Sequence, residues 1–237
     1  MRLLDADSRA VVGLPFQHAD GAAVAVDPIR FRIALYSNSN RCVQVLRTQT
    51  APEPRRHLRL GLTSAGLSFS PDRSVLAASG YQEGLVRLLD TTTWKPVRPP
   101  KRHPAWTWHT SFSPDGLYVA SVGTGAGVVR YRDARTGVDV WPPKTLVGMA
   151  TATGVSYDGS VVGAVTYPEG VWLWDARTGS DIGGPLGGQA VDCAFSPTAP
   201  LVAAPFDRSV EVWSIRPLKQ ELFIPNTSSN YSAPGLS

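Results

Sequence analysis

Short apolar segments recur along the chain, and polar or glycine-rich turns separate them. One kind of segment mixes branched residues with alanine or glycine, and its copies are VLAAS at 75–79, YVASV at 118–122, VVGAV at 161–165 and LVAAP at 201–205. Across a hairpin, each is followed by a second kind, of which VWLWD at 171–175 is the clearest. A strand that is apolar at successive positions is covered on both faces. The pattern predicts an all-β protein made of buried sheets.

These segments repeat with a fixed period. A turn phrase such as SFSPDG (111–116) recurs, and the residues that open it, Phe69, Phe112, Val155 and Phe195, are separated by 43, 43 and 40 positions, with Val26 a further 43 before Phe69. The residues that close the second kind of segment keep the same period: Asp5, Arg47, Asp90, Asp133, Asp175 and Ser214. A period of roughly 40–45 residues is typical of propeller blades, each of which is a four-stranded sheet.

The chemistry of the turns agrees with this interpretation. Proline presets φ for a turn, and Asp-Gly tolerates the positive φ that follows. The pentapeptide DARTG occurs at 133–137 and again at 175–179. Its aspartate can accept a backbone N–H, and its glycine supplies a left-handed residue. Both phrases predict tight turns between antiparallel strands.

We therefore predict an all-β fold, a β-propeller built from four-stranded antiparallel blades, with about five blades plus an N-terminal half-blade. Residues 1–17 are expected to form the half-blade, with third and fourth strands only, 18–224 the five blades, and 225–237 a disordered tail. The two ends do not match. We expect a piece of a longer propeller, or a chain that self-associates through its open blade ends. The alternative is a strained small ring that absorbs the half-blade.

Composition narrows the class of protein. The net charge of +4 is mild, so a nucleic-acid partner is not expected. Two cysteines, Cys42 and Cys193, do not make a disulfide framework and favour a reducing compartment. The first ten residues carry charges where a signal peptide needs an apolar core, and no apolar run approaches the roughly 18 residues of a membrane span. We expect a soluble, cytoplasmic protein without a membrane partner.

Motifs for catalysis or cofactor binding were sought and not found. The four histidines and two cysteines lack zinc spacing, and no G-x-S-x-G elbow is present. The stretch GTGAG at 123–127 joins two strands and has no Lys-Ser/Thr after it, so a hairpin is expected in place of a phosphate loop. His103 and His109 lack a third ligand in view. We predict no catalytic residue, metal or cofactor.

The most unusual stretch is KRHPAWTWH at 101–109, in a connection that leads into a first strand near one mouth of the ring. Trp106 and Trp108 have the same parity, so both point to one face if the strand starts early, and Arg102 adds charge. Aromatic residues and arginine are the types that anchor interfaces. The alternative is that the two tryptophans cover the blade edge or plug the channel. Hairpins expected at the same mouth add Tyr81, Tyr167, Phe206 and Arg208 as candidate partner-binding residues.

The chain resembles the WD-repeat family of β-propellers, in the style of bacterial WD-repeat arrays. The resemblance rests on Phe-Ser-Pro-Asp at 69–72 and 112–115 and on Trp174-Asp175. It implies a non-catalytic scaffold that binds another protein or peptide through the mouth of the ring. Two alternatives stay open: the sensor or regulatory part of a larger signalling protein, and a propeller enzyme. His103 occupies the position of a family histidine, but its blade lacks the aspartate that would pair with it.

Overall fold

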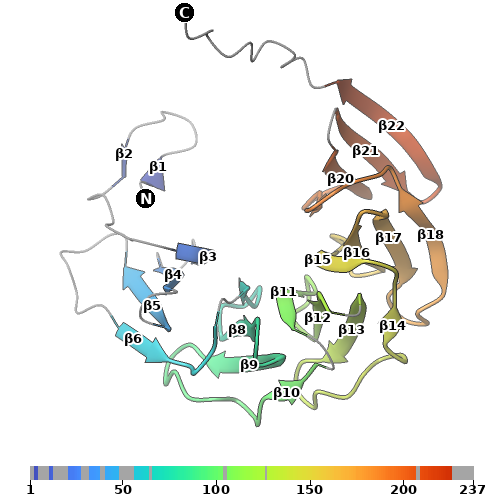
Figure 1. The fold of residues 1–237 in the computed structure, drawn as a ribbon. Helices are drawn as coiled ribbons and strands as arrows, with labels where there is room; N and C mark the ends of the chain where they lie inside the picture. The colour runs from blue at the N-terminus through green and yellow to red at the C-terminus, as the bar shows by residue number, and fades with distance from the viewer. Residues whose placement is uncertain are drawn as a thin grey trace, which may run out of the picture.

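In the computed structural model, the residues that can be described are 3–4, 11–12, 21–27, 32–37, 41–47, 56–63, 66–103, 106–125, 127–206 and 209–225. They form five four-stranded antiparallel sheets and one two-stranded sheet, and no helix occurs among them. The predicted all-β propeller with about five blades is confirmed. Figure 1 shows the blades arranged around a common centre, with the first strand of each near the centre and the fourth outside.

The blades are numbered here in chain order. The first contains β3 (Gly21–Asp27), β4 (Arg32–Ser37), β5 (Cys42–Arg47) and β6 (Arg56–Arg59). The second contains β7 (Leu67–Phe69), β8 (Val75–Gly80), β9 (Leu85–Asp90) and β10 (Lys101–Arg102). The third contains β11 (Thr107–Phe112), β12 (Tyr118–Gly123), β13 (Val128–Asp133) and β14 (Lys144–Thr145). The fourth contains β15 (Met149–Val155), β16 (Val161–Tyr167), β17 (Gly170–Asp175) and β18 (Asp181–Leu186). The fifth contains β19 (Ala194–Phe195), β20 (Leu201–Phe206), β21 (Ser209–Ile215) and β22 (Leu218–Pro225).

The two ends of the chain differ from a complete blade. Strands β1 (Leu3–Leu4) and β2 (Val11–Val12) pair with each other in a sheet of two strands. At the other end, the predicted tail begins one residue too early, because Pro225 pairs with Ser209 as the last residue of β22. The rest of that segment, 226–237, lies outside the described residues. Figure 1 shows an open arc, with a gap between the first and fifth blades.

The recurring turn phrase folds in the same way in three blades. In the second blade, the Ser70 hydroxyl donates to Asp72 Oδ1 over 2.6 Å and accepts from the Val75 N–H over 2.9 Å. Ser113 with Asp115, and Ser156 with Asp158, repeat this arrangement. The turn then needs a positive φ, which Gly116 supplies at 74° and Arg73 adopts at 63° in the second blade. The serine–aspartate pair therefore sets the corner that starts the second strand in these three blades.

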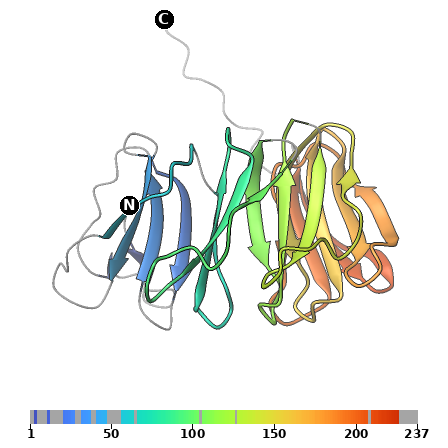
Figure 2. The ribbon, with the colours of Figure 1, turned by 90° about the horizontal axis from the view of Figure 1, so that it is seen from below.

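The core is divided among the junctions between blades. Four buried apolar clusters lie between successive blades, one at each junction. Between the third and fourth blades, the Trp141 ring stacks on Tyr131 with centroids 6.0 Å apart and lies tilted against Trp174 at 6.4 Å. Small residues such as Ala120 and Ala164 let these sheets approach closely. In Figure 2 the sheets stand side by side, with their strands running between the two faces of the ring. No single blade could bury such surface alone.

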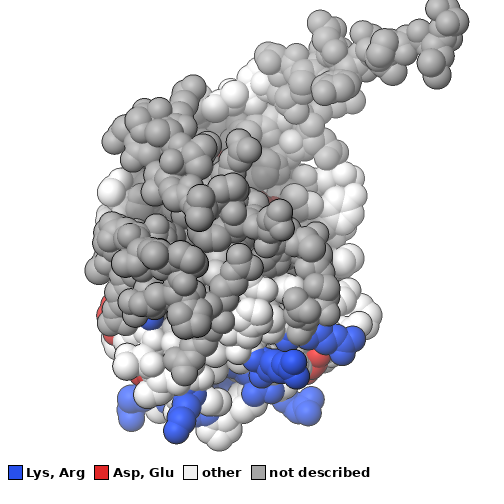
Figure 3. All heavy atoms as spheres, turned by 90° about the vertical axis from the view of Figure 1, so that its left-hand side faces the viewer, with Lys and Arg blue, Asp and Glu red and all other residues white. Residues whose placement is uncertain are grey.

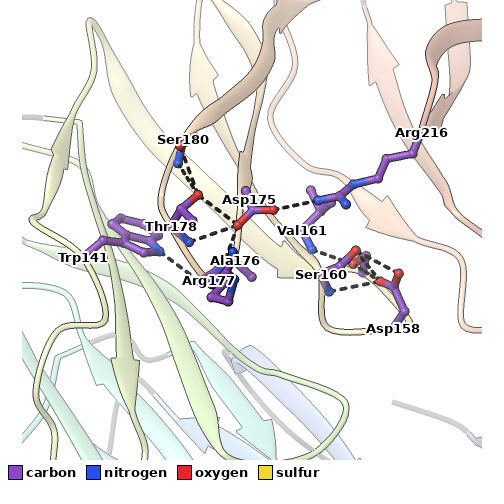
Figure 4. Close-up of polar contacts among 11 residues, drawn as sticks. Trp141, Asp158, Ser160, Val161, Asp175, Ala176, Arg177, Thr178, Ser180 and Arg216 are labelled. Atoms are coloured by element: carbon purple, nitrogen blue, oxygen red, sulfur yellow. Dashed lines mark hydrogen bonds and ion pairs between the residues drawn. The ribbon is translucent and has the colours of Figure 1, made fainter.

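The turn after the third strand is a second point of attachment between blades. In DARTG at 175–179, Asp175 Oδ1 accepts from the Thr178 N–H and hydroxyl, both over 3.0 Å, and the Thr178 N–H is the main cause that lowers the pKa of Asp175. Figure 4 shows that both neighbouring blades contact this turn. Trp141 Nε1 of the third blade donates to the Ala176 carbonyl, and Arg216 of the fifth blade donates to Asp175 over 2.9 Å.

The same attachment recurs at earlier junctions. Arg98 of the second blade donates from Nε to the Ala134 carbonyl of the third blade over 3.1 Å. Arg32 of the first blade donates from Nη1 to the Thr91 carbonyl of the second over 3.0 Å. In every case, a side chain from one blade donates a hydrogen bond to a carbonyl or carboxylate oxygen in the turn that follows the third strand of an adjacent blade. The pentapeptide that looked like a simple turn thus also links blades.

Candidate functional site

Three aromatic side chains meet at the end of the ring where the hairpins between second and third strands lie, called the mouth face below. The Tyr81 ring lies 5.0 Å from Trp106 and 5.3 Å from Trp108, with interplanar angles of 49° and 78°. Trp106 and Trp108 are 51% and 46% exposed, whereas Thr107 between them is fully buried. We call these three residues the aromatic cluster.

Backbone hydrogen bonds hold the aromatic cluster in place from two blades. Tyr81 starts the hairpin after β8, and its N–H donates to the Thr63 carbonyl over 2.8 Å. The Trp106 carbonyl accepts from the Thr124 N–H of the next blade's hairpin, also over 2.8 Å. Glu83 accepts from the N–H and the hydroxyl of Thr63, which fixes the loop beneath Tyr81. The rings are therefore presented by ordered backbone, which lowers the entropy cost of binding.

The other predicted site residues lie elsewhere. Tyr167 ends β16 in the fourth blade, and its hydroxyl donates to Gln189 over 3.4 Å. Phe206 ends β20 in the fifth blade and packs edge-on against Trp213, with centroids 5.6 Å apart. Arg102 is exposed on β10, the outermost strand of the second blade. Arg208 is outside the described residues. Of the predicted set, the structure brings together only Tyr81, Trp106 and Trp108 among the residues it describes.

His103 lies beside this site in the connection between the second and third blades. Its side chain is buried against Gly123, and neither ring nitrogen has a hydrogen-bond partner in the described part of the chain. Burial, and next the positive charge of Arg132, lower the pKa of His103 to about 4. The hydroxyls of Thr107 and Thr124 are buried without partners as well. The imidazole is therefore neutral in the folded protein at pH 7, and its protonation opposes folding.

A fall in pH should destabilise the protein already at pH values well above those at which carboxylates titrate. The His103 pKa is about 4 in the folded chain and about 6.5 when unfolded, so the unfolded state binds more protons between these values. Stability should be full above pH 7 and fall as the pH drops, by about 2 kcal/mol at pH 5 from this group. Burial also lowers the pKa of His109, which acts in the same direction. Thermal melts between pH 7.5 and 4.5 measure the effect.

Replacement of His103 by glutamine removes this titrating group, so the H103Q variant should show a clearly shallower loss of melting temperature between pH 7 and pH 5. The variant H57Q, at an exposed position on β6, is the matched control and should keep the parental slope. A full parental slope in H103Q would show that other groups cause the acid sensitivity.

A cluster of charged residues that the sequence reasoning missed lies at the outer side of the junction between the second and third blades. Arg130 donates to both oxygens of Asp139, over 3.1 and 2.6 Å, and Arg132 Nε donates to Asp139 Oδ1 over 3.1 Å. Both arginines also donate to the Arg102 carbonyl. A signal was present in the sequence: Arg132 occupies the repeat position that Leu89, Trp174 and Trp213 occupy in other blades.

The described residues offer little for acid–base, nucleophilic or metal chemistry. Among them, no three His, Cys, Asp or Glu side chains lie close enough together to hold a metal ion. Burial, and then the charge of Asp192, raise the pKa of the Cys193 thiol to about 12, and burial raises that of Cys42. Thiols with raised pKa values are poor nucleophiles. What the aromatic cluster can do is bury apolar or planar groups of a partner.

The residues that the structure describes contain no helix of the length and apolarity needed to cross a membrane. By sequence, the chain matches no protein-family model and no curated protein. By structure, it is similar to the crystal structure of the β-propeller domain of Cps50 (Swd1) from Myceliophteria thermophila, with a TM-score of 0.72. That similarity has 17% sequence identity and covers 89% of this chain and 73% of the other. It supports the propeller fold.

Proposed function

We propose that this chain is a WD-repeat-like propeller that works as a non-catalytic platform and binds another protein or peptide through the aromatic cluster. One observation carries the proposal. Trp106 and Trp108 are about half exposed and touch the same tyrosine, whereas Trp141, Trp174 and Trp213 are buried in the junctions between blades. Exposed aromatic groups gathered in one place are typical of binding sites, where they supply most of the affinity.

The geometry of the rings favours an extended polypeptide as partner. Tyr81 is tilted by 49° to one tryptophan and nearly perpendicular to the other, so the rings offer their faces and edges in different directions. Successive side chains of an extended peptide could pack against such faces. Tyr167 and Phe206 lie at equivalent hairpins of the fourth and fifth blades, and a longer partner that follows the mouth face would reach them.

The proposal can be tested with peptides selected from a random library displayed on phage, using the intact chain as bait. Trp106→Ala should lower the affinity for the selected peptides by roughly tenfold or more, as expected for a hot-spot residue. Leu117→Ala, which truncates an exposed apolar residue at the opposite end of the third blade, between β11 and β12, should leave the affinity within about twofold. Binding is measured by fluorescence anisotropy, with light scattering to follow the mass of the protein. Equal affinities of parent and W106A would refute the site.

Self-association through the open blade ends is a second mode that one observation favours. On β21 and β22 of the fifth blade, Val210, Leu222 and Ile224 are exposed on a face that no further blade covers in the described structure. Val24 and Val26 are exposed on β3 of the first blade. Apolar sheet faces and open edges promote association. The light scattering in the peptide experiment separates this mode from binding at the aromatic cluster.

The proposal places the protein in the cytoplasm, and Cys42 and Cys193, both free thiols, support this location. The aromatic cluster would serve equally in a scaffold of its own or in the regulatory part of a larger signalling protein. An enzyme is the weaker proposal, since the aromatic cluster itself contains no histidine, cysteine or carboxylate, the groups that most often act as general base or nucleophile.

A further inference from the structure

The junction between the second and third blades differs from the two that follow it. At the third-to-fourth junction, the third strand contributes Trp172 and Trp174, and Trp174 is buried against the third blade. Arg130 and Arg132 occupy the same two repeat positions in β13 and face the second blade. The apolar cluster at this junction is correspondingly small, with five buried members. In the outer half of this junction, charged side chains take the place of the apolar side chains found at the third-to-fourth junction.

Five cations lie at this junction, and we call them the basic seam: Arg98, Lys101, Arg102, Arg130 and Arg132. The Arg132 side chain is buried, and the other four are partly or fully exposed. The Arg102 carbonyl accepts from Arg132 over 2.8 Å and from Arg130 over 3.3 Å. Arg98 and Lys101 both lie against Gly137 in the turn after β13. These contacts connect the Arg130 and Arg132 side chains to the backbone of β10, and place the Arg98 and Lys101 side chains against the turn after β13.

The positive charge of the protein is concentrated around this seam. Residues 84–139 contain eight Lys and Arg against four Asp and Glu, an excess that equals the net charge of +4 of the whole chain. Figure 3 shows lysine and arginine side chains gathered along the lower edge of the molecule, where Figure 1 places β6, β9 and β10. A concentrated field of one sign speeds the approach of partners with the opposite sign.

The four acidic residues in this range are already engaged within the chain. Asp90, Asp115 and Asp133 accept hydrogen bonds in their own turns, and Asp139 is shared by Arg130 and Arg132. In the part of the chain that the structure describes, no carboxylate lies within ion-pair distance of Lys101 or Arg102. Arg102 is exposed and Arg130 retains 20% of its side-chain exposure. Cationic groups are thus left facing the solvent.

We propose that the basic seam is a second docking surface, which binds an acidic polypeptide segment. Asp139 shows which group the seam accepts, because its carboxylate sits between two guanidinium groups with a bidentate contact to Arg130. Carboxylate is the planar partner that matches an arginine fork. Glutamate or aspartate side chains of a partner would extend this arrangement outward to Lys101 and Arg102. The aromatic cluster takes no part in this binding, so the proposal for the basic seam does not depend on the proposal for the aromatic cluster.

The test uses a fluorescein-labelled peptide of twelve glutamates, a peptide of twelve lysines with the same label, and a labelled single-stranded DNA oligonucleotide, each titrated with the full chain at several salt concentrations. The parent should bind the glutamate peptide, with an affinity that falls as salt rises, and should not bind the lysine peptide. The charge-reversed variant Lys101→Glu/Arg102→Glu should lose roughly tenfold in affinity. The control Arg177→Glu/Lys219→Glu carries the same charge change at exposed positions of the fourth and fifth blades.

The outcomes separate the possibilities. A tenfold loss in K101E/R102E, with the control within about twofold of the parent, would support the seam. Equal losses in both variants would mean that net charge alone attracts the peptide, and would overturn the proposal. DNA that binds more tightly than the glutamate peptide and loses affinity in K101E/R102E would assign the seam to nucleic acid instead. Circular dichroism melts verify that both variants, altered only at or near the surface, fold like the parent.

Discussion

Replacing Trp174 by alanine should destabilise the protein more than any other single truncation discussed here. The indole is 1% exposed and lies at the centre of the cluster between the third and fourth blades, 6.4 Å from the Trp141 ring. Truncating a buried tryptophan costs about 3–5 kcal/mol, because the lost contacts add to the cost of a cavity. For a chain of this size, that corresponds to a fall in melting temperature of roughly 10 °C. Thermal and urea unfolding followed by circular dichroism measure it.

Trp106→Ala is the matched comparison, since it removes the same side chain from a half-exposed position on the mouth face. Its cost in stability should be below about 1 kcal/mol, as is usual for surface substitutions. The two variants together separate a structural tryptophan from a binding one. If W106A melted at or below the temperature of W174A, the roles assigned to the two residues would be reversed.

Replacing Asp27 by alanine should cost about 3 kcal/mol, the second largest effect expected. Its carboxylate is fully buried and accepts from Arg32 over 3.0 and 3.3 Å, with Arg73 at 3.9 Å. Without this carboxylate, two largely buried guanidinium groups would share a low-dielectric site. Removing one partner of a buried pair is expensive because the remaining charge is left uncompensated.

The position of Arg32 extends the effect to the neighbouring blade. Arg32 also donates to the Thr91 carbonyl and lies over the rings of Phe69 and Trp94 in the second blade. Asp181→Ala breaks a single ion pair with Lys144, in which the aspartate side chain is 76% exposed, and should cost under about 1 kcal/mol. Melting curves of D27A and D181A that coincide would show that Asp27 contributes no more than a surface ion pair.

Features that depend on neighbouring residues were predictable from the sequence. The Ser-Pro-Asp phrase predicts a turn because serine and aspartate bond to backbone groups only a few residues away, as Ser70 and Asp72 do. The period of the phrases then predicts how many such units the chain contains.

Features that depend on contacts between blades were only partly predictable. Parity along one strand could not place Trp106 and Trp108, because Trp106 precedes β11 and the register of β11 shifts between Thr107 and His109. The contact of both rings with Tyr81 comes from the preceding blade. Tyr167 and Phe206 lie at equivalent hairpins, one and two blades further around the ring, so equal repeat positions do not bring side chains together. Arg102 was grouped with the tryptophans by sequence proximity, whereas the connection from β10 to β11 runs from the outer edge to the centre.

The turns after β9, β13 and β17 accept hydrogen bonds from side chains of neighbouring blades, namely Arg32, Arg98, Trp141 and Arg216. These contacts make the blades a linear series of coupled units. Nearest-neighbour coupling of this kind produces a gradient of local opening, in which a unit held from both sides opens less often than one held from a single side. Amide hydrogen exchange should therefore be slowest in β12 and β16 and faster in β20, which is less buried than they are. Such a molecule would open first at the fifth blade, with the third and fourth blades protected for longer.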